Sequence, residues 1–212
     1  MFYRMTVYVL GMFVNYFGVA LLIKATLGAG FWTALFVGIS DKLGLTVGIW
    51  YGIFQFVFIF INGWLMKQKP EIRALLPLVL ESLILDFWLE MVFKNMSLAS
   101  APFIVQLITL GIGVVFSALG VSIYILPQLP RAPVDQLFLV ISKKFKLTLR
   151  MSQTAVALTT STSALLIGGP VGLGTAVGVA FAGVLIQYFY TYGYPLYYLY
   201  HPHYRQRFQP VL

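Results

Sequence analysis

Two acidic residues lie inside an apolar stretch of this chain, where they would meet little water. Glu81 and Asp86 belong to "ALLPLVLESLILDFW", residues 74–88. A carboxylate held inside a bilayer needs a counter-charge, a proton or a ligand, because its ionised form is costly there. The chemistry that these two side chains offer is therefore cation binding or proton transfer.

Spacing decides how these groups can cooperate on a helix. At about 100° per residue, Asp86 shares a face with Ser82 and Glu90, whereas Glu81 points about 140° away from Asp86. One helix therefore does not bring both carboxylates to a single ligand. One interpretation is that Asp86, with Glu81 in support, faces a cavity near the membrane midplane and binds a cation or carries a proton.

An internal salt bridge is the alternative for the same residues. Lys24, near the outer end of the first apolar run, is placed to reach Asp86 or Glu90, and Glu90 can pair with Lys94 one turn later. The sequence favours neither interpretation of Asp86, but it favours the ion pair for Glu90.

The elements that position these acids are membrane spans. Hydrophobic residues make up 60% of the 212 residues and charged residues 9%, against about 25% charged in soluble domains. The apolar runs have the length of about 20 residues that a bilayer requires. They predict an all-α membrane protein with six spans, at residues 5–27, 46–66, 74–93, 103–127, 148–168 and 170–192.

Composition also argues against several other functions. The chain contains no cysteine, so it has no thiolate site, and its two histidines fall in the tail. The sequence also shows no zinc motif, no phosphate loop and no nucleophile–base set. We expect no enzyme, no cofactor and no metal. The net charge is +8, but no basic stretch is long or separate from the apolar runs. The basic residues are therefore better explained as a signal for membrane orientation than as a nucleic-acid binding surface.

One mixed phrase occurs twice at an offset of 102 residues. Residues 39–46 read "ISDKLGLT" and residues 141–148 read "ISKKFKLT". Glycines match at the same offset, Gly11 with Gly113 and Gly18 with Gly120. This indicates an internal repeat, with repeat 1 at about 5–93 and repeat 2 at about 103–192. Three spans per copy predict inverted halves, related by a pseudo-two-fold axis in the membrane plane.

Basic residues give the orientation. With the N-terminus inside, most lysines and arginines fall on the cytoplasmic side, including those of the second phrase. The sequence therefore predicts a multi-pass protein of the cytoplasmic membrane with both termini cytoplasmic. Residues 193–212 are predicted to form a cytoplasmic aromatic and basic tail.

A short helix follows the first span of each repeat. Apolar residues recur at helical spacing from Trp32 to Leu43 and from Val134 to Phe145. Pro133 suits the first turn of the second helix, and Asp135 suits its positive end. At about 13 residues neither helix can span a bilayer, so each lies along the interface or enters the membrane as a re-entrant segment; the interfacial interpretation is favoured.

At these motifs the chain resembles the YczE/YyaS/YitT group of bacterial integral membrane proteins. The resemblance covers essentially the whole chain. It rests on an apolar helix with small residues, a Leu-Gly turn, a "PWD"-like motif and then "I-S-x-K-x-x-L-T". Here the motif is split, because residues 31–33 read "FWT" and keep the tryptophan, whereas residues 133–135 read "PVD" and keep the proline and the acid. The activity of the group is largely unassigned, so the resemblance implies a fold and no substrate.

The predicted substrate or ion site lies between the halves. The repeat aligns Asp86 with Gln187, which would place a carboxylate and an amide at similar depths. The complete predicted set is Asp86, Glu81, Gln187, Asn15, Trp32 and Asp135.

These features support one leading function and two alternatives. Inverted repeats and intramembrane acids favour a small secondary transporter or exporter. The alternatives are a substrate-binding membrane subunit of an ATPase-driven uptake system, or a lipid-interacting structural protein. The expected partners are the lipid bilayer and a small molecule or ion, with no nucleic acid, and a homodimer is an additional expectation.

Overall fold

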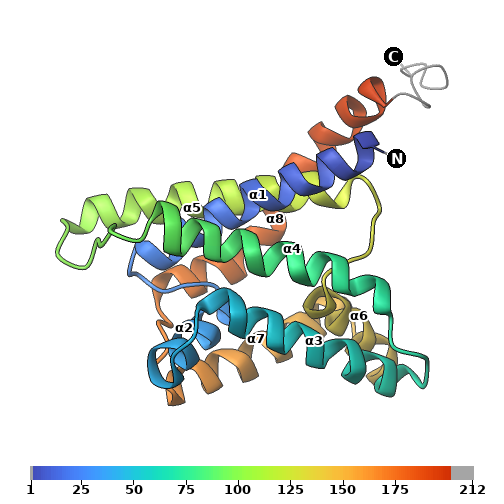
Figure 1. Ribbon diagram of the computed structural model, residues 1–212, viewed down its shortest axis with the longest axis horizontal. Helices are drawn as coiled ribbons and strands as arrows, with labels where there is room; N and C mark the ends of the chain where they lie inside the picture. The colour runs from blue at the N-terminus through green and yellow to red at the C-terminus, as the bar shows by residue number, and fades with distance from the viewer. Residues whose placement is uncertain (1, 202–212) are drawn as a thin grey trace.

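The computed structural model describes residues 2–201, apart from the side chains of residues 149 and 150. Over these residues the chain is helical and contains no strand (Figure 1). Residues 202–212 of the predicted tail lie outside the described residues. The helices are α1 Phe2–Lys24, α2 Phe31–Leu43, α3 Val47–Met66, α4 Leu75–Asp86, α5 Phe103–Ile125, α6 Pro133–Phe145, α7 Leu149–Leu166 and α8 Leu173–Tyr200.

Four of the described helices, rather than six, have the length and composition of membrane spans. Helices α1, α3, α5 and α8 are long and apolar enough to cross a membrane. The third predicted span consists of a 3-10 turn at Ile72–Ala74, α4, and a π-helical turn at Phe87–Val92. Helix α7 is rich in serine and threonine, which lowers its hydropathy.

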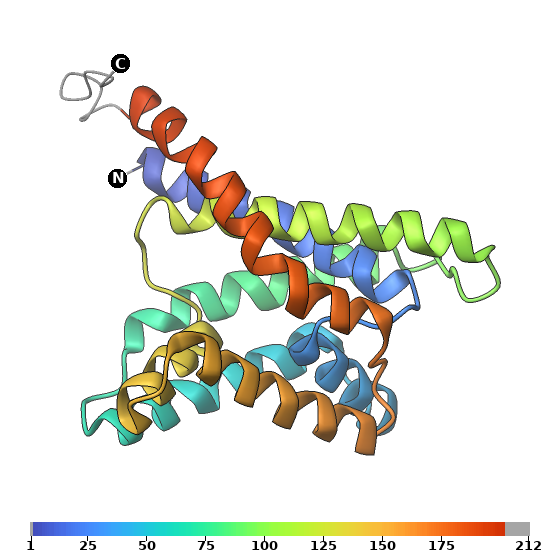
Figure 2. The ribbon, with the colours of Figure 1, turned by 180° about the vertical axis from the view of Figure 1, so that it is seen from behind.

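Helices α1 and α5 form the closest pair in the fold, and they run antiparallel (Figures 1 and 2). A Cβ atom on Gly18 would lie 2.3 Å from the backbone nitrogen of Ser117, and one on Gly120 would lie 2.1 Å from that of Asn15. Only glycine permits these approaches. The two contacts are equivalent in the predicted repeat, because Gly120 lies 102 positions after Gly18 and Ser117 lies 102 positions after Asn15.

The two short helices, α2 and α6, also make matching contacts. Helix α2 packs on α7, and its counterpart α6 packs on α3. These four helices occupy the lower part of Figure 1, with α4 between them and the α1–α5 pair. The two copies differ at their last helix, because α4 packs on α3 whereas α8 packs mainly on α5.

The repeated phrase makes the same junction in both copies. The hydroxyl of Ser40 donates to the carbonyl of Leu45 at 2.7 Å, and that of Ser142 donates to the carbonyl of Leu147 at 2.7 Å. The threonine that ends each phrase is the N-cap of the next helix, accepting from a backbone N–H at 3.2 Å in both. The shared Ser and Thr therefore terminate one helix and start the next.

One predicted boundary differs. The last span was predicted to end at residue 192, but α8 continues to Tyr200 through Gly193 and Pro195. The first aromatic residues of the predicted tail therefore belong to the helix. Tyr194 and Tyr198 lie on one face of it, with ring centroids 4.7 Å apart. Sequence alone gave no reason to carry the helix through a proline.

Candidate functional site

A cavity of about 210 Å³ lies at the centre of the fold, and we call it the central cavity. Helices α1, α2, α3, α4, α5 and α6 all contribute to its wall, so both halves of the chain enclose it. Its lining residues are Asn15, Tyr16, Val19, Gly30, Phe31, Trp32, Thr33, Tyr51, Glu81, Leu85, Ser117, Val121, Tyr124, Val134 and Asp135.

Glu81 is the buried acid of this cavity, with 1% of its surface exposed. Its Oε2 atom accepts a hydrogen bond from Nε2 of Gln55 at 2.5 Å and a longer one from the hydroxyl of Tyr51 at 3.4 Å. The hydroxyl of Tyr16 in turn donates to that of Tyr51 at 2.9 Å. Neutral donors thus orient the carboxylate, and no lysine, arginine or histidine lines the cavity to neutralise it.

Asp135 brings a second carboxyl group from the other half of the chain. It lies in the first turn of α6, which begins at Pro133 as the sequence predicted. The hydroxyl of Tyr124 donates to its Oδ2 atom at 2.9 Å. The start of α6 is held by α3, because Nδ2 of Asn62 donates to the carbonyl of Pro133 at 2.9 Å.

The first turns of both short helices meet the cavity. Residues 30–33 line it from the start of α2, and Val134 and Asp135 line it from the start of α6. The rings of Phe31 and Phe138, one from each helix, have centroids 6.4 Å apart. Because helix N-termini carry partial positive charge, this geometry supports a negative charge on Asp135.

The structure brings together four of the six residues predicted as the site. Glu81, Asn15, Trp32 and Asp135 line the central cavity. Nε1 of Trp32 is buried without an acceptor, and Oδ1 of Asn15 accepts from Ser117 at 2.8 Å. No three His, Cys, Asp or Glu side chains gather to hold a metal ion in the part of the chain described.

Asp86 and Gln187 do not line this cavity. Gln187 is exposed on α8. Asp86 faces the start of α3, where its Oδ1 accepts from the backbone nitrogen of Gly48 at 2.8 Å and its Oδ2 accepts from the hydroxyl of Thr46. These neutral groups, rather than Lys24, are the partners of Asp86. The carboxylate lies at the N-terminus of α3, where a negative charge is favourable.

Replacing Asp86 with alanine is therefore expected to destabilise the fold. The change leaves the Gly48 N–H and the Thr46 hydroxyl without their acceptor, at a cost of about 1–3 kcal/mol. Thermal unfolding in detergent measures this as a lower midpoint. Glu90→Ala is the matched control, because Glu90 is exposed on the same segment. Equal midpoints for the two variants would contradict the capping role.

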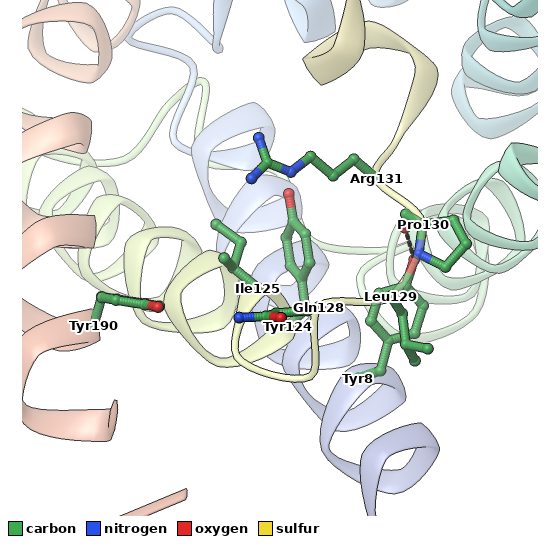
Figure 3. A pocket seen from close by; sticks show the side chains of 8 residues that line it. All are labelled: Tyr8, Tyr124, Ile125, Gln128, Leu129, Pro130, Arg131 and Tyr190. Carbon is green, nitrogen blue, oxygen red and sulfur yellow. Dashed lines mark hydrogen bonds between the residues drawn. The ribbon is translucent and has the colours of Figure 1, made fainter. Parts of the chain in front are cut away.

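A second cavity adjoins the first and holds about 290 Å³ (Figure 3). The two cavities share Tyr124, which lines both of them. The second cavity lies along the linker between α5 and α6, which the hydroxyl of Tyr8 holds by donating to the carbonyl of Pro130 at 2.7 Å. Arg131 and, from α8, Tyr190 complete this wall.

Several cavity residues were not predicted as site residues. Tyr16, Tyr51 and Tyr124 are tyrosines in apolar helices, a pattern that packing alone explains equally well. Gln55 of α3 does not line the cavity, but it is fully buried and donates a hydrogen bond to Glu81. The sequence signal that could have identified Gln55 is an amide within an apolar span, which is a suitable partner for an acid in a neighbouring span.

Comparison with known proteins agrees with the motifs. A family model described as a family of unknown function, DUF6198, matches residues 2–191. The uncharacterized protein YyaS of Bacillus subtilis is 33% identical over 86% of this chain and 90% of its own length. The uncharacterized membrane protein YczE of the same organism is 29% identical over 87% of this chain and 84% of its own.

A third relative, an uncharacterized protein of Haemophilus influenzae, is 25% identical over 81% of this chain and 76% of its own length. No solved structure matches the chain. The motif resemblance to YczE and YyaS is thus confirmed over most of the sequence, and the chain belongs to the DUF6198 family of YczE/YyaS-type proteins.

Proposed function

We propose that this protein is a small secondary transporter whose substrate site is the central cavity. The observation that carries the proposal is the pair of carboxyl groups, Glu81 and Asp135, which reach one cavity from the two halves of the chain. Transporters built from repeats place their sites at the interface of the repeats, and they use broken or short helices there. Movement of one half against the other would open the cavity to each side in turn.

The architecture in this proposal is six membrane spans in two inverted repeats. The reciprocal glycine contacts of α1 and α5 support it, as do the matched Ser and Thr junctions after α2 and α6. In this arrangement α2 and α6 are re-entrant segments, because their first turns reach the central cavity. Both termini are cytoplasmic, as the distribution of basic residues indicates.

A chain of hydroxyl groups supports coupling to protons. Tyr16 donates to Tyr51, and Tyr51 donates to Glu81, so the three groups are ordered toward the carboxylate. An intramembrane carboxylate with such partners is suited to exchange a proton against a cargo. Proton coupling is therefore the form of secondary transport that we propose.

Single-cysteine labelling tests the inverted architecture. The chain has no native cysteine, so Lys42→Cys and Lys144→Cys each introduce one exposed thiol, and the two positions differ by the repeat offset. In intact cells a membrane-impermeant maleimide is expected to modify residue 42, whereas residue 144 should react only after the membrane is opened. Labelling of both thiols from one side would overturn the inverted repeat.

Alternating access is tested at Thr33, which lines the central cavity. In vesicles of known orientation, Thr33→Cys should react with small reagents from either side, and a bound substrate should slow both reactions. Reaction from only one side, together with stable co-purification of an ATPase, would instead favour a binding subunit of an uptake system.

A further inference from the structure

We infer that the ligand of the central cavity is a small organic ammonium ion. The inference rests on the proposed transport function and specifies its substrate class. It follows from three properties of the wall, namely its charge, its aromatic rings and its size.

The charge of the wall calls for a cation. Glu81 and Asp135 are the two ionisable acids among the lining residues, and no basic side chain joins them. Arg131 lines the adjoining cavity, and its positive charge acts on Asp135 from there, so Glu81 is the acid that is left without a counter-charge. A buried carboxylate that lacks a counter-charge is costly, so a positively charged ligand would supply the missing partner.

The rings of the wall favour an organic cation over a bare metal ion. Five of the lining residues are aromatic: Tyr16, Phe31, Trp32, Tyr51 and Tyr124. Aromatic faces attract ammonium groups, and cages of such rings recognise quaternary ammonium ligands. A metal ion would have only the two carboxylates of the wall to bind it, because no three His, Cys, Asp or Glu side chains gather within the described residues.

The walls are also held in place before a ligand arrives. The ring of Trp32 stacks on Phe36 at 6.0 Å with an interplanar angle of 11°, and Phe58 packs against it at 5.2 Å. Tyr16 and Tyr51 meet edge to face at 5.9 Å. A cavity of about 210 Å³ is smaller than the roughly 300–1,000 Å³ of sites for drug-sized ligands, so the ammonium must be small.

The test compares small ammonium ions with a neutral molecule that has the shape of one of them. Purified protein in detergent is titrated with tetramethylammonium, choline and ethanolammonium, and also with 3,3-dimethylbutan-1-ol, the neutral analogue of choline. Isothermal calorimetry measures binding directly. We expect at least one ammonium to bind, and choline to bind at least about tenfold more tightly than its neutral analogue if choline is that ligand. Failure of all three ammonium ions to bind, or binding of the neutral alcohol as tight as that of the best ammonium ion, would overturn the inference.

Two matched variants locate the site. Glu81→Gln keeps the size of the side chain and is expected to weaken ammonium binding at least about tenfold. Glu90→Gln makes the same change at an exposed position of the same segment and should bind as the unmodified protein does. Unchanged binding by the Glu81 variant, with its thermal midpoint preserved, would remove the cavity from the proposal.

The same material separates this inference from the transport function. Ammonium binding without any ammonium flux into proteoliposomes would refute the transporter and leave the ligand class intact. Flux of a neutral or anionic solute, with no ammonium binding, would support a transporter and refute the ligand class.

Discussion

Transport by the Glu81→Gln variant is expected to fall by about two orders of magnitude. Glu81 is 1% exposed, and its carboxylate is the end of the hydrogen-bonded series from Tyr16 through Tyr51. The amide cannot carry the charge that a cation needs or exchange a proton at neutral pH. Removing a buried charged partner costs about 3 kcal/mol or more, which corresponds to about a hundredfold.

The measurement is initial uptake into proteoliposomes with an imposed pH gradient, over a panel of ammonium ions. Glu90→Gln serves as the control for loss of one acidic group from the same segment. Asp86→Asn should retain transport, because the Asp86 side chain contacts the start of α3 and does not line the cavity. Full transport by the Glu81 variant would exclude it from the mechanism, whereas loss only in the Asp86 variant would relocate the site.

Adding one methyl group at Gly120 is expected to disrupt the fold more than any other alanine substitution discussed here. The new Cβ would lie 2.1 Å from the backbone nitrogen of Asn15 and 2.4 Å from its Cα. Backbone atoms cannot turn away as a side chain can, so α1 and α5 must separate. Overpacking costs about 1–3 kcal/mol, and a clash with backbone should reach or exceed the upper value.

Gly111→Ala on the same helix is the matched control. A Cβ at Gly111 meets no atom within 4 Å, so the change should be neutral or stabilise the helix by up to about 1 kcal/mol. Thermal unfolding in detergent should therefore shift the two midpoints in opposite directions, or lower only that of the Gly120 variant. Equal shifts would show that helix propensity, rather than the α1–α5 contact, sets the effect.

The helices could be predicted from the sequence because apolar runs and helix caps are local patterns. The apolar runs placed the helix bounds within a few residues, apart from the end of α8. The matched glycines led to the prediction of a repeat, but only the fold shows that Gly18 of α1 contacts α5 and that Gly120 of α5 contacts α1. Pairing between spans depends on tertiary contacts that no single segment encodes.

The two acids of α4 show where local reasoning ends. Helical geometry correctly placed Glu81 and Asp86 on different faces. It could not decide which face meets the cavity, because this depends on where α3 lies. Gly48, the residue that approaches Asp86, gave no signal beyond being a glycine in an apolar run. The assignment of Asp86 as the principal site residue remains a prediction; in the structure Glu81 lines the central cavity and Asp86 does not.

The contact between Asn15 and Ser117 has a consequence for biosynthesis. The amide oxygen of Asn15 takes its hydrogen bond from a residue 102 positions later in the chain. When α1 leaves the ribosome, its glycine surface and this amide have no partner until α5 has been translated. Polar groups of a nascent span are costly in lipid. We therefore expect α1 to remain beside the translocon until α5 arrives, so that insertion of the first half is completed only by the second.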